Sequence, residues 1–491
     1  MNKENPAYFD AYELDLDTGA CTMTFKNSDN AVGLIADKNL VIRGITQITE
    51  DGGTNVLIRK STQDAWQKII HWDIEEQENS HVIGFNHEDN KLYILDSRNS
   101  NTNKFAVIDL TTNTQQTLFC DEQSSYDIIG VRFTPDMSAP IDAIILAEKQ
   151  KIIVLNKNYE EDFNILQKTN SGEITSISTN NAHTRWIVGF SHDTAPVRYY
   201  YYDRTTKQTT FLFSCCPKLE QYQLQPMYPI LFTASDGLPV HGYITYSAQP
   251  CEKQPLVLLV HGGPALRDTW GYDPEAQFLA NRGYACLQIN YRGSAGYGKN
   301  FLNAGNKEWG RRMHQDLIDA INWATRTNIA DSKRIAIMGG SYGGYAALCG
   351  AAFNPDLFCC AVDLFGVSNL ITLIKNSPPY WRPLLALLKQ RIGDLETEEA
   401  MLKERSPLFY AHQIKCPLLI AQGDNDPRCT PAESEQIIAE LKKHNIAYTY
   451  LHYGNEGHGI VNQEKRLALF GSIEQFLMQH LGQAQPVPNL T

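Results

Sequence analysis

The sequence predicts an all-β, propeller-like domain followed by an α/β domain whose mostly parallel sheet carries helices on both faces. Residues 1–214 read as short strands between polar turns, with no convincing helix. One hairpin pattern recurs among them at a fixed spacing. From residue 230 onward, strands alternate with longer helical stretches, which is typical of a parallel sheet covered by helices. We therefore expect domains at 1–214 and 230–491, joined by a linker at 215–229.

A repeated hairpin indicates the propeller. Its copies carry an Asp before a Thr-rich turn, at YELDLDTGACTMTF (12–25), FAVIDLTTNTQQTLF (105–119) and YYYYDRTTKQTTFLF (199–213). Asp15, Asp109 and Asp203 lie 94 residues apart each time, which is twice 47. We expect weaker copies at 60–72 and 155–167. A period near 47 residues fits a propeller blade, which runs to about 40–50 residues, better than the alternative, a β-sandwich.

The α/β half contains apolar, β-branched runs and amphipathic stretches in alternation. Strands are predicted at 230–234, 240–246, 256–260, 285–290, 334–338, 360–365, 418–422 and 448–453. Helices are predicted at 313–326, 345–353, 432–444 and 464–481. Open α/β sheets bind ligands beyond the carboxyl ends of their strands, so we expect the functional site there.

A serine among glycines follows one of these strands. Gly339-Gly340-Ser341-Tyr342-Gly343 matches G-x-S-x-G, the nucleophile elbow of α/β-hydrolase folds, and it lies between a predicted strand and a predicted helix. Small flanking residues permit the strained turn that exposes the hydroxyl. The N-terminus of the following helix directs free N–H groups to the same place. We therefore expect Ser341 to be a nucleophile.

The nucleophile needs a histidine base. In this fold class the base comes last in the chain, after the acid. His458 lies in a Gly-flanked loop, GNEGHGI (454–460), between the last strand and the last helix. His444 and His452 are expected in a helix and a strand, and His412 precedes the acidic residues. His458 is therefore the expected base.

The base needs an acid that orients it. Asp424 and Asp426 both follow the strand at 418–422. Either could instead shape the turn or cap the next helix. Their spacing does not decide which of the two aspartates is the acid.

A second Gly-rich loop, His261-Gly262-Gly263-Pro264, follows the buried strand LVLLV (256–260). It is similar to the HGGG-type loops whose backbone N–H groups bind an oxyanion. We expect the N–H groups of Gly263 and Tyr342 to form that pair.

Composition narrows the class of protein. The chain has 491 residues, 43% of them hydrophobic and 20% charged, and a formal net charge of −12 without a long basic stripe, which argues against nucleic-acid binding. We see no secretory signal and no membrane-spanning run, so we expect no membrane association. The 11 cysteines include no C-x-x-C pair, and we expect them to be reduced in a cytoplasmic protein.

Together the motifs resemble the prolyl oligopeptidase family of serine peptidases, nearest its acylaminoacyl-peptidase and oligopeptidase branch. The similar stretches follow the family order through the second half: HGGP (261–264), RGYACLQINYRGSAGYG (282–298), GGSYGGY (339–345), ERSPL (404–408), GDNDPR (423–428) and EGHG (456–459). The resemblance implies that Asp426, rather than Asp424, is the acid. It implies that Arg428 binds a substrate carbonyl. It further implies that Tyr342, Val367 and Trp381 point toward the pocket for the residue before the scissile bond.

The first half departs from the family pattern. Seven or eight blades of about 47 residues would need well over 300 residues, whereas about 214 precede the linker. The copy at residues 7–27 is a hairpin without the strands that should precede it, so we expect about four blades plus a hairpin. An open, shortened propeller is expected rather than a small closed ring. Its unpaired edge would need a cover, which a homo-oligomer would supply.

These features predict a serine peptidase that hydrolyses short peptides through an acyl-enzyme, of the oligopeptidase or acylaminoacyl-peptidase kind, with no metal or cofactor. The alternatives are a carboxylesterase, which would use the same residues, and a catalytically impaired propeller scaffold. Dipeptidyl-peptidase members of the family bind a free amino terminus with paired glutamates. Glu75-Glu76 and Glu160-Glu161 are adjacent pairs here. Because acidic pairs are usually solvated surface, we assign them no role.

Overall fold

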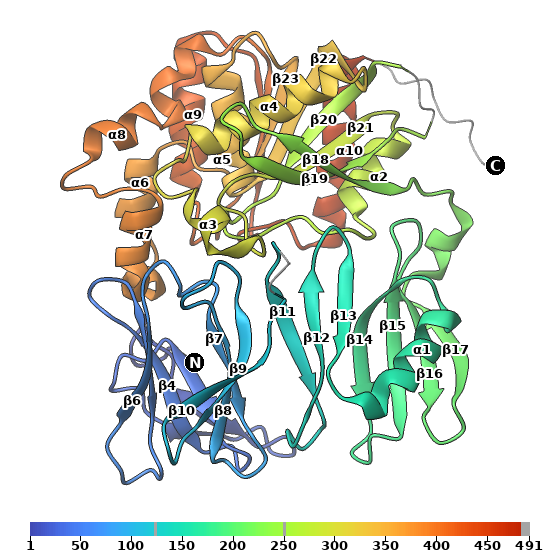
Figure 1. The fold of residues 1–491 in the computed structure, drawn as a ribbon. Coiled ribbons are helices and arrows are strands. Elements are labelled where there is room, and N and C mark those ends of the chain that lie inside the picture. The colour runs from blue at the N-terminus through green and yellow to red at the C-terminus, as the bar shows by residue number, and fades with distance from the viewer. Residues whose placement is uncertain (122–124, 249–251, 483–491) are drawn as a thin grey trace.

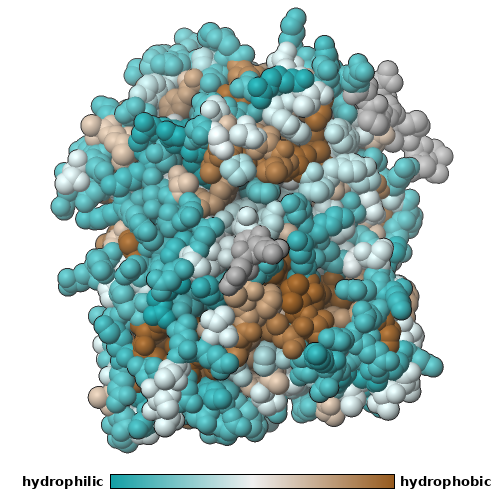
Figure 2. Space-filling view, viewed as in Figure 1, coloured by the Kyte–Doolittle hydropathy of each residue, from teal (hydrophilic) through white to brown (hydrophobic). Residues whose placement is uncertain are grey.

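The computed structural model describes residues 1–121, 125–248 and 252–482. The β sheets of the first half lie side by side, and the α/β half covers one end of them (Figure 1). On the face seen in Figure 2 most residues are hydrophilic, and apolar residues gather over β11 to β13. Within the described ranges, no helix has both the length and the apolar character needed to cross a membrane.

The β half consists of a hairpin and a series of antiparallel sheets. The hairpin pairs β1 (Ala11–Leu14) with β2 (Cys21–Phe25). The sheets comprise, in turn, β3 (Gly33–Ala36), β4 (Ile42–Ile48), β5 (Thr54–Ile58) and β6 (Gln67–Trp72); β7 (His81–Phe85), β8 (Lys91–Asp96), β9 (Lys104–Asp109) and β10 (Thr114–Phe119); β11 (Ile128–Phe133), β12 (Pro140–Leu146) and β13 (Gln150–Val154); and β14 (Glu173–Thr179), β15 (Arg185–Ser191), β16 (Arg198–Asp203) and β17 (Gln208–Ser214). Successive sheets begin 48, 47 and 45 residues apart, at Gly33, His81, Ile128 and Glu173. This is the period that the sequence repeat indicates.

The repeated aspartates have a structural cause. Asp109 Oδ1 accepts hydrogen bonds from the N–H groups of Thr111 (2.8 Å) and Thr112 (3.1 Å). Asp203 Oδ1 accepts from the N–H groups two and three residues later at 2.8 and 3.1 Å, and Asp15 Oδ1 does the same at 3.0 and 2.7 Å. Each carboxylate therefore closes the turn of a hairpin, β1–β2, β9–β10 or β16–β17.

One predicted hairpin copy is wrong. Residues 155–167 contain a 3-10 turn (Lys157–Tyr159) and helix α1 (Glu160–Thr169) instead of strands. Phe163 and Leu166 lie three residues apart and are buried, which suits one face of a helix. They pack against Trp186 of the next sheet, and Glu160-Glu161 begin the helix. The sheet β11–β13 therefore has three strands, and α1 follows β13 in the chain where the neighbouring sheets have a fourth strand.

The α/β half is built on one eight-stranded sheet in the order β18-β19-β21-β20-β22-β23-β24-β25. Its strands are β18 (Met227–Thr233), β19 (Pro239–Thr245), β20 (Gln254–Val260), β21 (Ala285–Asn290), β22 (Ala330–Gly340), β23 (Cys360–Leu364), β24 (Leu418–Gly423) and β25 (Tyr448–Tyr453). The strands from β20 to β25 are parallel, and β18 and β19 are antiparallel at one edge. All eight predicted strands belong to this sheet, which confirms the predicted fold class.

Helices cover both faces of the sheet (Figure 1). The longer ones are α2 (Pro274–Asn281), α4 (Arg312–Arg326), α5 (Tyr342–Phe353), α9 (Pro431–Lys443) and α10 (Gln463–Leu481); the shorter ones are α3 (Gly298–Asn303), α6 (Leu370–Lys375), α7 (Leu385–Arg391) and α8 (Glu399–Glu404), with 3-10 turns at Pro217–Gln221, Pro379–Leu384 and Pro407–Gln413. On β20, Leu256 and Leu258 face the core under α4 and α5, whereas Val257 and Leu259 face the core under α2 and α10. Burial on both faces explains why this strand is continuously apolar.

Candidate active site

The carboxyl edge of the parallel sheet gathers most of the predicted site residues. Gly263 follows β20, Ser341 follows β22, Val367 follows β23, Asp426 and Arg428 follow β24, and His458 follows β25. Since parallel strands end at the same edge, segments almost 200 residues apart in sequence meet there.

Ser341 sits on a strained turn between β22 and α5. Its φ of 59° and ψ of −117° are rare for a residue with a side chain. A Cβ atom on Gly343 would lie 2.0 Å from Val260 O, and one on Gly339 would lie 2.5 Å from the same oxygen. The two glycines are therefore required because the turn is pressed against the end of β20. This packing accounts for the spacing of the G-x-S-x-G motif.

The imidazole of His458 is bound to a buried carboxylate. His458 Nδ1 and Asp426 Oδ2 are 2.7 Å apart, and the side chain of Asp426 is inaccessible to solvent. Asp426 Oδ1 accepts hydrogen bonds from the N–H groups of Arg428 (2.8 Å) and Cys429 (3.0 Å). These bonds fix the carboxylate, which in turn orients the ring and leaves its Nε2 for another partner. Asp424 instead contacts His452, and both of those side chains are exposed.

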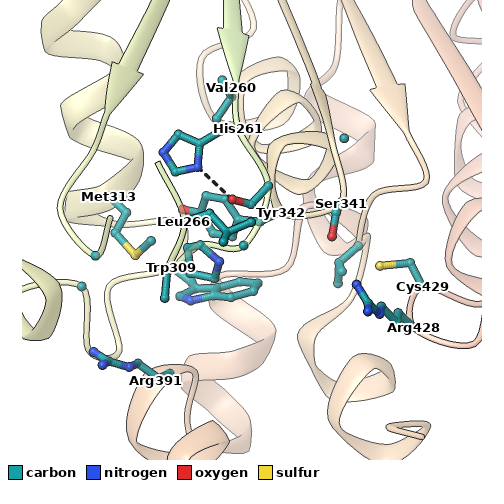
Figure 3. A pocket seen from close by; sticks show the side chains of 18 of the residues that line it. Val260, His261, Leu266, Trp309, Met313, Ser341, Tyr342, Arg391, Arg428 and Cys429 are labelled. Atoms are coloured by element: carbon teal, nitrogen blue, oxygen red, sulfur yellow. Dashed lines mark hydrogen bonds between the residues drawn. The ribbon is translucent and has the colours of Figure 1, made fainter. Parts of the chain in front are cut away.

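The hydroxyl of Ser341 lies beside the thiol of Cys429 (Figure 3). In the described part of the chain, no hydrogen bond joins Ser341 Oγ to His458. Serine and histidine both line the same cavity. Catalytic hydrogen bonds are often long or misaligned until a substrate binds, so rotation of the hydroxyl is compatible with a catalytic pair.

The HGGP loop lies against the elbow. A Cβ atom on Gly262 would lie 3.2 Å from Gly340 O and 3.5 Å from Ser341 Cβ. His261 holds the start of this loop, because its ring stacks on Tyr291 with centroids 4.4 Å apart. Burial lowers the pKa of His261 to about 4, so the ring is neutral and structural at ordinary pH.

A cavity of about 720 Å³ opens above the elbow. Predicted residues that line it are Ser341, His458, Gly263, Tyr342, Arg428, Val367 and Trp381. In Figure 3, Arg428 and Ser341 lie on one side, and Met313 and Trp309 lie on the other. Apolar side chains of the segment 381–392 form a further wall: Trp381, Leu384, Leu387, Leu388 and Ile392. An apolar cavity with a few polar groups is the usual form of a small-molecule or peptide site.

Glu433 fixes the loop that carries Val367. Its Oε2 accepts hydrogen bonds from the N–H groups of Ser368 and Asn369, both at 3.0 Å, and its Oε1 accepts one from Thr372 Oγ1. Glu433 lies on α9, directly after the turn that carries Asp426. The Glu433 carboxylate therefore connects the turn that carries Asp426 to one wall of the cavity.

The β half also contributes to the cavity. Glu78 lines it and forms an ion pair with Arg391, which lines it as well. Nearby, Lys299 on α3 is bound to Glu76 at 2.9 Å. Sequence reasoning missed Glu78 and Arg391, because 313 positions separate them and neither belongs to a motif. The only sequence feature near Glu78 that could have indicated a role for this segment was the adjacent pair Glu75-Glu76.

The described residues contain no group of three or more His, Cys, Asp or Glu side chains that could hold a metal ion. The described cysteines other than Cys120 are free thiols. The carboxyl edge of the sheet thus brings together a serine, a carboxylate-bound imidazole and the backbone of the HGGP loop.

This fold and site define a serine hydrolase of the α/β-hydrolase class with a propeller-like N-terminal domain. Residues 270–484 match the model of the prolyl oligopeptidase family, and the chain belongs to this family. It is 38% identical over 502 residues to dipeptidyl aminopeptidase BIII of Pseudoxanthomonas mexicana, an alignment that covers 99% of this chain and 72% of that protein.

A further relative and a solved structure are also similar to this chain. The acylamino-acid-releasing enzyme of Sus scrofa is 29% identical over 234 residues, covering 46% of this chain and 32% of that enzyme. A solved puromycin-hydrolyzing peptidase of Mycobacterium tuberculosis has the same fold, with a TM-score of 0.77, 22% identity, and coverage of 95% of this chain and 72% of that one. The protein is thus a serine peptidase that acts on short peptides.

Proposed function

We propose that Ser341, His458 and Asp426 are the catalytic triad of this peptidase. The observation that carries the proposal is the 2.7 Å contact between His458 Nδ1 and buried Asp426 Oδ2, beside a cavity that Ser341 also lines. His458 Nε2 takes the proton of Ser341 as its oxygen attacks the peptide carbonyl. The N–H groups of Gly263 and Tyr342 stabilise the oxyanion. His458 then protonates the leaving amine, and water hydrolyses the acyl-enzyme.

Arg428, Val367 and Trp381 bind the acyl side of the substrate in this proposal. The guanidinium of Arg428 would donate to a backbone carbonyl, and the two apolar side chains would contact the residue before the scissile bond. All three line the same cavity as Ser341, which supports these roles. Family membership favours a peptidase over a carboxylesterase or an impaired scaffold.

We further propose that the substrate is a short peptide with a free amino terminus, from which a dipeptide is released. Two observations favour this over the acylaminoacyl type. The dipeptidyl aminopeptidase is similar along 99% of this chain, whereas similarity to the acylamino-acid-releasing enzyme covers 46%. Glu78 also brings a carboxylate to the cavity wall, where it could bind an ammonium group.

The paired aspartates provide a matched test of the triad. Asp426→Asn should lower kcat by about 10³–10⁴, because the imidazole loses its orienting charge. Asp424→Asn should leave kcat within about twofold. Turnover of a dipeptidyl anilide measures both, and Ser341→Ala should neither turn over nor take up a fluorophosphonate. Equal losses in the two Asp variants would contradict the assignment of Asp426.

The amino-terminal requirement has a separate test. Free dipeptidyl anilides should be cleaved at least about 10-fold faster than their N-acetylated forms, since one charge-assisted hydrogen bond contributes about 1.5–3 kcal/mol. Glu78→Gln should remove most of that difference, and exposed Glu75→Gln should not. Faster cleavage of the acetylated substrates would instead indicate the acylaminoacyl type.

A further inference from the structure

Acidic side chains line part of the same cavity, away from the triad. Asp268 lies in the loop after β20, Asp273 precedes α2, and Glu275 lies in the first turn of α2. Gln288 of β21 completes the group. We call these four residues the acidic lobe.

Two oxygen atoms of the acidic lobe lack partners. Gln288 is 1% exposed, and its Oε1 accepts no hydrogen bond. Asp268 Oδ2 is buried and has none either. Asp273 has a structural role as the N-cap of α2, because Asp273 Oδ1 accepts a hydrogen bond from the N–H of Ala276 at 2.7 Å. Nothing comparable explains the Asp268 and Gln288 oxygens, and buried acceptors of this kind are costly unless a donor reaches them.

The nearest cations do not neutralise the acidic lobe. The guanidinium of Arg267 donates to Leu146 O and Ala147 O, at 2.8 and 3.0 Å, and lies over the Tyr297 ring. Arg466 of α10 lies over the ring of Phe470. Both lower the pKa of the lobe carboxyls only through longer-range attraction.

The carboxylates of Asp268, Asp273 and Glu275 repel one another when they are ionised. Burial, followed by the Asp273 carboxylate, raises the pKa of Asp268 to about 8 and that of Glu275 to about 7. Cys286, which faces the same carboxylates, is a neutral thiol because burial raises its pKa. A bound cation would relieve this repulsion.

We propose that the acidic lobe binds the cationic side chain, a lysine ammonium or an arginine guanidinium, of the peptide substrate. An organic cation fits better than a metal ion, because the described carboxylates do not converge as metal ligands do. An ammonium or guanidinium supplies several donors at once, enough for Asp268 Oδ2 and Gln288 Oε1 together. This inference rests on the proposed function, since the cavity must hold the substrate of Ser341.

The test uses isosteric substrate pairs. In peptides scanned on both sides of the scissile bond, lysine is compared with norleucine and arginine with citrulline. At one position, kcat/KM should be at least about 10-fold higher for the cationic member. Asp268→Asn, which resembles the protonated acid in shape, and Glu275→Gln should each reduce that ratio at least about threefold. They should lower kcat/KM less for norleucine peptides than for lysine peptides. Glu464→Gln, an exposed change in the first turn of α10, is the control.

The pH dependence gives a second readout. Below the pKa values of Asp268 and Glu275, these two carboxyls are protonated in the empty lobe, and a cation must displace their protons. The lysine-to-norleucine ratio in the wild type should therefore rise between pH 6 and 8, while lysine stays charged. A ratio near one at every position, or a ratio that survives both substitutions, would overturn the inference. Loss of norleucine cleavage in Ser341→Ala is a separate result that concerns the triad alone.

Discussion

At the scale of single residues, backbone contact decides which glycines matter. A methyl group on Gly343 would meet Val260 O at 2.0 Å, whereas one on Gly471 of α10 would meet nothing within 4 Å. Both glycines are helical, in α5 and α10. Glycine is therefore needed at the first position because β20 approaches it, and it is replaceable at the second.

Gly343→Ala should destabilise the protein by at least about 3 kcal/mol, since neither the helix nor the strand can retreat without disturbing the sheet. It should also abolish cleavage by displacing Ser341. Gly471→Ala should stabilise the protein by roughly 0.5–1 kcal/mol through helix propensity. Denaturant unfolding measures both, and a Gly343→Ala variant of wild-type stability would contradict the packing argument.

At the scale of elements, helix α9 links the turn that carries Asp426 to the cavity wall formed by the loop of Val367. Glu433, near its start, binds the loop after β23 through a buried carboxylate with several donors. Strand β24 and helix α9 thus position Asp426 and Val367 together, although the two residues lie on different loops.

Glu433→Gln should raise KM several-fold, because an amide N–H₂ would face the N–H groups of Ser368 and Asn369. It should cost about 1–3 kcal/mol of stability, since buried donors lose their acceptor. The change in kcat should be smaller than the change in KM, because Ser341 and His458 are not touched. Exposed Glu435→Gln on the same helix is the matched control, and an equal KM in the two variants would exclude this positioning role.

At the scale of the whole molecule, polar contacts hold the β half against the α/β half beside the cavity. Lys299 donates to Glu76 at 2.9 Å and to Ser97 O at 3.1 Å, and the side chains of Lys299 and Glu76 are 18% and 12% exposed. Removing one partner of such a pair leaves the other charge poorly solvated. Removing one partner of a surface pair does not, because water solvates the remaining charge.

Lys299→Met should therefore lower the free energy of unfolding by about 2–3 kcal/mol and raise KM, because the cavity lies between the halves. Lys415→Met should change stability by less than about 0.5 kcal/mol, since its pair with Asp356 is 63% and 81% exposed. Thermal unfolding and peptide cleavage measure both effects. If the two variants behave alike, the junction does not depend on this pair.

Local patterns predicted much of the molecule. The Thr-rich turns, the eight strands of the large sheet and the elbow around Ser341 each depend on residues within a few positions of one another. The helix α1 was missed because Phe163 and Leu166 are the only apolar residues of its buried face, and two residues are too short a pattern to stand out among strands. Between Asp424 and Asp426, the motif spacing left both open until the family resemblance was considered.

The sequence by itself determined the chain order of the eight strands of the large sheet, the period of the β half and the residue types available for acyl transfer, because these depend on local spacing. Only the tertiary structure decided which distant groups meet. It brings Asp426 within 2.7 Å of His458, pairs Glu78 with Arg391 across 313 positions, and leaves Gln288 and Asp268 with unpartnered oxygens in one cavity. The physical reason is that parallel strands end at one edge and the β half packs against it, so proximity there follows from the fold and not from position in the chain.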